Sequence, residues 1–185
     1  KFWACQAAAA KALGTIRTAG ARDALLRCLA VRNLKAKRAV VAALGEFRGD
    51  TTVFDAIAPI AKKDQSWFVE AEACRSVGKL RLEDSLEILK RNIDRDSFRQ
   101  VVRIGCIDGL VELRSEAGLE ILSRVARYGE AFQGRTPAVG ALARLGVYFP
   151  DRKKLLGEEI AGYLEDPDFR VRIGAANALK ALKDD

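Results

Sequence analysis

The sequence predicts an all-α fold, a right-handed solenoid of about five and a half stacked helix pairs. The first observation is a recurring apolar phrase that ends in glycine: "AAAAKALG" at Gly14, "AVVAALG" at Gly45, "EACRSVG" at Gly78 and "AVGALARLG" at Gly146. The second is its spacing, because self-similarity at about 30 to 35 residues is typical of stacked-repeat proteins. The third is the absence of any long alternation of apolar and polar residues, the pattern that predicts strands.

Each repeat unit is expected to consist of two helices. In the third unit, the apolar residues from Val69 to Leu80 follow the three-to-four spacing of a buried helical face, and those from Leu86 to Ile93 repeat it after a break at Arg81. Alanines crowd the first helices, which allows neighbouring helices to approach closely. We therefore divide this single array into units at roughly 1–32, 33–64, 65–96, 97–129, 130–166 and 167–185.

Short motifs predict where helices and loops begin and end. Ser97 with Gln100 has the form of a capping box, and Asp166 with Pro167 places a cap before a proline at the first helical position. Gly78 and its counterparts are expected in the last turn of each first helix, where the chain turns tightly into the second. The segments 127–137 and 146–154 are predicted to be loops that interrupt the array, and loops on a rigid scaffold often carry binding residues.

The composition excludes most familiar catalytic groups. The chain has no histidine, which rules out His-based general bases, Ser–His and Cys–His pairs and the H-E-x-x-H zinc helix. Glu70 and Glu72 do not share a helix face, so no acid/base pair is predicted there. The four cysteines are too scattered for a zinc knuckle, and among apolar neighbours we expect all of them to pack as small hydrophobic side chains: Cys5, Cys28, Cys74 and Cys106. No catalytic, cofactor-binding or metal-binding residue is assigned.

The helix pairs that end in A-L-G resemble HEAT repeats, in particular the short repeats of phycobilisome-lyase-like proteins. Longer phrases are similar to the C-terminal helical region of bacterial zinc aminopeptidases of the aminopeptidase N family. They are "SWFVEAEACRSVGKLR" (66–81), "DSFRQVVRIGCIDGLVEL" (96–113) and "ARYGEAFQGRTPAVGALARLG" (126–146), followed by "LEDPDFRVRIGAANAL".

The aminopeptidase resemblance implies a non-catalytic domain that packs against a preceding zinc-bearing catalytic domain and helps to enclose its active site. The zinc-binding motif and the G-x-M-E-N motif of that family are absent here, since the chain has neither histidine nor methionine, so no catalytic residue carries over. Both ends lie within apolar helical sequence, from which we expect a piece of a longer chain. The partner would then be the preceding domain, and a peptide substrate would be met only indirectly.

Positive charge is concentrated at the start of the chain. The net charge is +7, and residues 1–49 contain ten Lys and Arg against two Asp and Glu, which leaves the remainder close to neutral. A groove that follows nucleic acid should be basic in successive repeats, so this distribution argues against nucleic acid. Lys35, Lys37 and Arg38 open a helix, where cations oppose the helix dipole. We expect either an acidic partner that compensates them or a solvated basic face.

Further candidate surface residues lie near the ends of the second helices. Arginines suit carboxylate ligands, and one interpretation is that, together with a tyrosine, they form a ligand-facing ledge: Arg91, Arg95, Arg124, Arg127 and Tyr128. The alternative is that they pair with Glu87, Asp94 and Glu120 on solvated faces. Arg135, in the predicted loop 127–137, joins this candidate surface. Trp67 and Phe68 are expected to wedge against the previous repeat rather than to stack on a ligand.

Three functional hypotheses remain. The chain is the enclosing domain of an aminopeptidase N-type enzyme without activity of its own, a free-standing module that binds an acidic protein through its basic start, or a HEAT-type nucleic-acid binder. The third predicts an affinity that falls steeply with salt. No apolar run reaches the roughly 18 residues that span a bilayer, so no membrane partner is predicted, and we expect a cytoplasmic protein.

Overall fold

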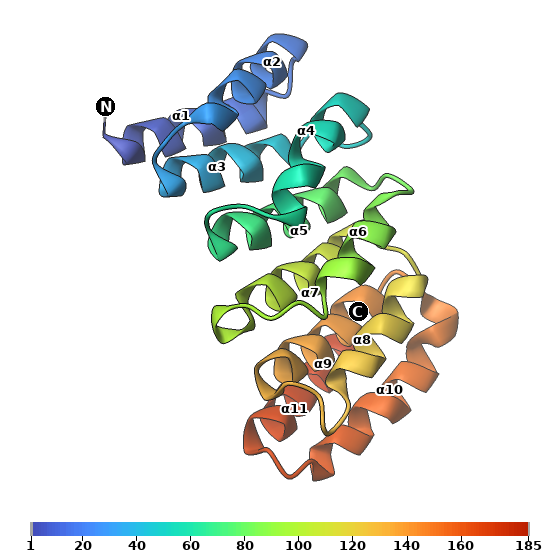
Figure 1. Ribbon diagram of the computed structural model, residues 1–185. Coiled ribbons are helices and arrows are strands. Elements are labelled where there is room, and N and C mark those ends of the chain that lie inside the picture. Colours follow the sequence, from blue (N-terminus) through green and yellow to red (C-terminus); the bar gives the residue numbers. More distant parts are fainter. Residues whose placement is uncertain (1, 185) are drawn as a thin grey trace. The chain divides into compact units, whose positions relative to one another are not determined.

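The computed structural model describes residues 2–184, and all regular elements in that range are helices (Figure 1). The chain divides into two compact units, residues 1–113 and 114–185, which are described separately. The prediction of an all-α fold built from stacked helix pairs is confirmed. No helix in the described range is both long and apolar enough to cross a membrane.

Residues 1–113 form two layers of helices. The first layer contains the first helix of each pair: α1 (Trp3–Ile16), α3 (Leu34–Leu44), α5 (Trp67–Leu80) and α7 (Val101–Leu113), each packed against the next. The second layer contains α2 (Ala19–Arg27), which continues into the short 3-10 helix η1 (Cys28–Ala30), then α4 (Thr51–Lys62) and α6 (Ser85–Asn92). The 3-10 turn η2 (Phe98–Gln100) precedes α7. Figure 1 shows this succession from blue to green.

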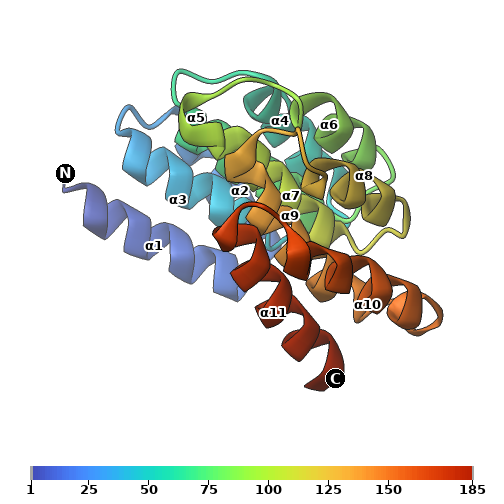
Figure 2. The same ribbon diagram turned by 90° about the horizontal axis from the view of Figure 1, so that it is seen from below.

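The described residues of the second unit, 114–184, continue the same plan with four α-helices and two short 3-10 helices. They are α8 (Ala117–Ala126), α9 (Phe132–Gly146), η3 (Pro150–Arg152), α10 (Lys153–Gly162), η4 (Tyr163–Glu165) and α11 (Phe169–Asp184). α9 packs against α8 on one side and α11 on the other, and α10 contacts both α9 and α11. Figure 2 shows α10 and α11 side by side in the C-terminal part of the chain.

The recurring glycines allow close contact between repeats, which corrects the prediction that they serve a tight turn. Gly14, Gly45 and Gly78 all lie at the end of a first helix with ordinary backbone angles. A Cβ added at Gly14 would lie 2.9 Å from the Cβ of Ala43, and one at Gly78 only 2.0 Å from the carbonyl oxygen of Gly109. Neighbouring first helices therefore approach too closely at these points for any side chain.

Three of the turns between paired helices are made by arginines. Arg17, Arg81 and Arg114 have φ of 52°, 56° and 56°, the left-handed conformation of a helix C-terminus. The backbone N–H of Arg17 donates to the carbonyl of Leu13, and that of Arg81 to Gly78. The break expected at Arg81 is confirmed. Each of these arginines directly follows the last residue of its first helix.

Two predicted helix starts are corrected. α11 begins at Phe169, and Asp168, not Asp166, caps it by accepting a hydrogen bond from the backbone N–H of Arg170 at 2.9 Å. The hydroxyl of Ser97 accepts from Val102 at 3.1 Å, but the side-chain oxygen of Gln100 has no hydrogen-bond partner within the described residues, so the capping box is not formed.

The predicted loop at 127–137 is short, because α9 already begins at Phe132 and includes Pro137. The other predicted loop, 146–154, is partly helical as well, since η3 and the start of α10 lie within it. Neither segment is the long interruption that the sequence pattern suggested.

Candidate functional site

Three of the predicted surface cations take part in ion pairs that link the start of a first helix to the segment leading into the next repeat. Lys37 and Arg135 are the fourth residues of α3 and α9, and each forms an ion pair with an aspartate just before the next first helix: Asp64 and Asp166 respectively. In α5 the polarity is reversed, because the fourth residue is Glu70 and its partner is Arg95, 3.1 Å away. The sequence did not reveal this pairing, because the partners are 25 to 31 residues apart.

This ladder of ion pairs also satisfies the backbone. Arg95 donates to the carbonyls of Ala61 and Lys62, and Arg135 donates to those of Ala126 and Arg127. Arg135 is almost completely buried, so its assignment to an interaction surface was wrong. Lys37 and Arg95 are partly exposed but held by their partners. The ladder explains why these charges occur in the sequence without any ligand.

The remaining candidates in residues 1–113 stay at the surface. Lys35 is exposed, and its Nζ lies 4.8 Å from the centroid of the Trp3 ring, while Arg38 is exposed as well. Arg91 contacts Glu87 at 3.8 Å with both side chains largely in water, which is the alternative that the sequence left open for it. An exposed pair of that kind contributes about 0 to 1 kcal/mol.

Arg124, Arg127 and Tyr128 lie in the other unit. Arg124 is half-buried, whereas Arg127 and Tyr128 are exposed after the end of α8. Arg127 lines a hollow of about 800 Å³ between α8 and α10. This hollow is mixed in charge: Arg152 donates to Glu116 at 2.6 Å, and the Ser123 hydroxyl donates to Glu159 at 3.0 Å. Burial and the neighbouring Glu159 carboxylate raise the pKa of Tyr163 to about 12.

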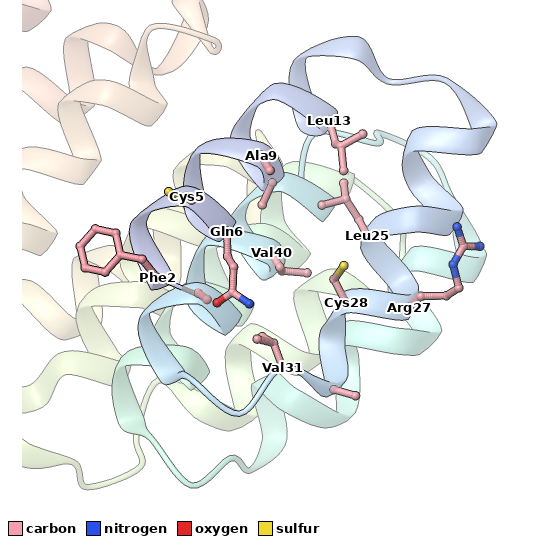
Figure 3. A pocket seen from close by; sticks show the side chains of 13 residues that line it. Phe2, Cys5, Gln6, Ala9, Leu13, Leu25, Arg27, Cys28, Val31 and Val40 are labelled. Carbon is pink, nitrogen blue, oxygen red and sulfur yellow. The ribbon is translucent and has the colours of Figure 1, made fainter.

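A more apolar groove lies at the other end of the chain. It is formed by α1, α2, η1 and α3, has a volume of about 760 Å³, and is lined by 13 residues, most of them apolar (Figure 3). Leu25 and Val40 are buried in its floor, and Ala9 lines its α1 wall. We call it the N-terminal groove.

The sequence builds this groove with small residues and one polar position. The alanine side chains of α1 are small, so they fill little of the groove. The left-handed turn at Arg17 reverses the chain, and α2 then runs back along α1. Gln6, the fourth residue of α1 and the counterpart of Lys37 and Glu70 in the ladder, lines the groove. Figure 3 shows Gln6 directed from α1 into the space in front of Val31 and Cys28.

Two thiols line the N-terminal groove. Cys5 on α1 and Cys28 at the start of η1 are exposed, whereas Cys74 and Cys106 are fully buried between helices. The prediction that all four pack as core residues is therefore confirmed for Cys74 and Cys106 and wrong for Cys5 and Cys28. Burial raises the pKa of the Cys106 thiol well above its ordinary value, and contact with Cys74 adds to the effect.

The floor of the N-terminal groove is apolar, and one of the residues that line the groove is basic. Arg27 lines it and is exposed, and Lys35 and Arg38 are exposed on α3. These residues belong to the first 49 positions, which contain ten Lys and Arg but only two Asp and Glu. The groove therefore offers an apolar floor inside a positively charged part of the molecule, whereas the α8–α10 hollow carries its own carboxylates.

The acidic side chains and thiols of the described residues do not gather into a metal-binding cluster. No group of three or more Cys, Asp and Glu side chains there is arranged to hold a metal ion. Glu70 is buried against Arg95, and Glu72 pairs with Arg75 at 2.9 Å, so the two glutamates do not act together.

Trp67 stacks on Phe98 of the following repeat, with ring centroids 6.5 Å apart, which corrects the prediction that it wedges against the previous one.

Comparison with known proteins agrees with the helical-repeat architecture. A family model of HEAT repeats matches residues 32–110, which run from just before α3 into α7. Among solved structures, the chain is similar to one in the complex of CpcE and CpcF of phycocyanin lyase from Nostoc sp. PCC7120, with 19% identity and a TM-score of 0.62. That similarity covers 89% of this chain and 65% of the other, so this chain spans about two thirds of its length. No curated protein matches the sequence.

Proposed function

We propose that this protein is a non-catalytic, protein-binding HEAT-like module whose N-terminal groove receives an amphipathic helix with an acidic outer face. The observation that carries the proposal is the apolar floor of the groove within the most basic part of the chain. An amphipathic helix binds such a groove with apolar side chains at positions i, i+3, i+4 and i+7.

Surface chemistry supports a helix as the occupant. The lining side chains present mainly apolar groups and two thiols, with Gln6 as a single amide and Arg27 as a single cation. Such a lining recognises apolar side chains rather than phosphates or sugars.

Charge supports an acidic outer face on that helix. Arg27 lines the groove and is exposed, so it would face the polar side of a helix seated there, and opposite charges raise the rate of association and set its orientation. The similar chain in the CpcE–CpcF structure is itself part of a complex of two proteins, which supports a protein as the partner here.

A synthetic helix tests the proposal. The probe is a labelled peptide of about 18 residues with leucines at the i, i+3, i+4 and i+7 positions and glutamates elsewhere, titrated with the full chain. We expect Ala9→Glu to weaken binding at least about tenfold, because it places a carboxylate in the apolar wall facing an acidic peptide. A peptide with lysines in place of the glutamates should bind more weakly to the unaltered protein.

The matched control is Ala8→Glu, which adds the same charge one residue away on another side of α1. It should leave the affinity within about twofold. Equal losses in the two variants, with unchanged helical circular dichroism, would show that charge and not the groove decides binding. No binding of either peptide would reject the proposed occupant.

A narrower proposal is that the module serves as the C-terminal enclosing domain of an aminopeptidase N-type zinc enzyme. It is supported by the resemblance of residues 66–81, 96–113 and 126–146 to that region, and zinc would then be bound elsewhere in the parent chain. The test is the open reading frame that encodes this chain. An in-frame H-E-x-x-H upstream of Lys1, followed by a glutamate about twenty residues later, supports the proposal, and its absence rejects it.

A further inference from the structure

Aromatic side chains recur at one position of the repeat and remain exposed there. The first residue of a first helix is Trp3 in α1, Trp67 in α5, Phe132 in α9 and Phe169 in α11. The last three of these are each about half exposed. Single exposed apolar residues are ordinary, but a repeated aromatic position that gathers rings on one surface indicates a contact.

Three rings gather around two guanidinium groups in residues 114–185. The Cζ atom of Arg170 lies 5.0 Å from the ring centroid of Phe132 and 5.7 Å from that of Phe169. The Cζ atom of Arg135 lies 5.5 Å from the ring centroid of Tyr128. Tyr128, Phe132 and Phe169 are 76%, 53% and 58% exposed. We call these three residues the aromatic edge.

The cations of the aromatic edge already have carboxylate partners. Arg170 donates to both carboxylate oxygens of Asp168, at 3.0 Å each, and Arg135 binds Asp166. The surface is therefore aromatic and locally balanced in charge. It offers little to a phosphate backbone, whose affinity depends on cations that are free to replace counterions. An uncharged ligand with flat apolar groups suits it better.

We propose that the aromatic edge binds a proline-rich segment of a partner protein in the polyproline II conformation. Prolyl rings are flat, apolar and uncharged, and aromatic-lined surfaces recognise them because the polyproline II helix is already extended and loses little entropy on binding. The guanidinium–ring contacts hold Phe132 and Phe169 in place, so the surface is largely formed before the ligand arrives.

The positions of the rings are compatible with this ligand. Because the Cζ atom of Arg170 lies 5.0 and 5.7 Å from the centroids of Phe132 and Phe169, the two centroids are at most about 10.7 Å apart, and α9 and α11 pack directly against each other. Prolines three residues apart on a polyproline II helix are separated by about 9.3 Å, which lies within this limit.

This site is independent of the N-terminal groove. The two lie in different units of the chain, and they recognise different chemistry, an acidic amphipathic helix in one case and an uncharged extended segment in the other. The protein would thus hold two segments of partner proteins at once, which is a function beyond the single-site module proposed above.

Peptide titration with the full chain tests the inference. The probe is a labelled, uncharged peptide with two P-x-x-P motifs, compared with the same peptide in which alanine replaces each proline. We expect the proline peptide to bind and Phe132→Ala or Phe169→Ala to weaken that binding at least about tenfold. Both rings are exposed, so these variants should keep the circular dichroism of the unaltered protein.

The matched control is Leu155→Ala, which removes an equally exposed apolar side chain from α10. It should leave the affinity unchanged. Equal affinity for the alanine peptide, no effect of the phenylalanine variants, or binding of single-stranded oligo-dT in preference to the proline peptide would each overturn the inference. An Ala9→Glu variant should bind the proline peptide normally, which separates failure at this site from failure at the groove.

Discussion

Arg135 and Asp166 form an ion pair with both side chains about 95% buried, and this pair joins the start of α9 to the segment that precedes α11. The Nε atom of Arg135 also donates to the carbonyls of Ala126 and Arg127, at 3.1 and 2.8 Å. One side chain therefore connects the end of α8, the beginning of α9 and the approach to α11. Arg135 acts as an internal clamp of its unit.

Removal of this clamp should destabilise the protein strongly. We expect Arg135→Met to lower the free energy of unfolding by about 3 kcal/mol, because it leaves the Asp166 carboxylate buried without a partner. Arg152→Met, which breaks the exposed pair with Glu116, should change it by less than about 1 kcal/mol. Urea unfolding measures both, and similar small effects would show that the buried pair is not structural.

The same pair predicts a loss of stability in acid. Hydrogen bonds from Arg135 lower the pKa of Asp166 below its ordinary value of 3.8. A carboxylate with a depressed folded pKa contributes stability that is present above the unfolded pKa and lost as the pH falls through the folded value. The difference in unfolding free energy between the unaltered protein and Asp166→Asn should therefore be constant near neutral pH and shrink below 3.8. A difference that is independent of pH would contradict this assignment.

The glycines at the repeat contacts should not tolerate a methyl group. We expect Gly78→Ala to cost at least about 3 kcal/mol, because the new Cβ would meet the backbone of Gly109 at 2.0 Å and the helices would have to separate. Gly140→Ala in α9 meets nothing within 4 Å and should stabilise the protein by up to about 1 kcal/mol through helix propensity. Thermal and urea unfolding of the two variants give opposite signs if this account of the glycines holds.

The four cysteines should react in two classes. Cys5 and Cys28 are exposed, whereas Cys74 and Cys106 are buried, and the pKa of the Cys106 thiol is raised. Since the thiolate is the reactive form, a maleimide should label the first two in the native protein and all four in urea. Mass spectrometry of peptides identifies the labelled positions, and native labelling of Cys74 or Cys106 would place them outside the core.

Local patterns in the sequence predicted the helices, but not the contacts between repeats. The three-to-four spacing of apolar residues from Val69 to Leu80 predicted a helix with one buried face. α5 does end at Leu80. The partner of Glu70 cannot be found this way, because Arg95 lies 25 residues away, beyond α6, and becomes a neighbour only when the chain folds back. For the same reason Arg135 resembled a loop residue in sequence and is buried in the structure.

The candidate site was predicted only in part. The basic charge of the first repeats was visible in the sequence, and Lys35 and Arg38 do lie on the surface. The apolar groove beside them was not, because Ala9 and Leu25 have the same periodicity as any core residue, and only the course of α2 leaves a hollow between them. The exposure of Cys28 depends on the same geometry. The arginine at three of the turns, in place of the expected glycine, was a local signal that the sequence interpretation missed.

The central claim is that a partner helix occupies the N-terminal groove, and the thiols that line it report on this directly. Alkylation of Cys5 and Cys28 is measured in the native protein with and without a saturating amount of the acidic amphipathic peptide, with Ala8→Cys as a reporter on another side of α1. We expect the peptide to slow labelling of both groove thiols at least about tenfold and to leave the Ala8→Cys thiol unaffected. A peptide that binds while Cys5 and Cys28 react at their original rates would contradict the claim.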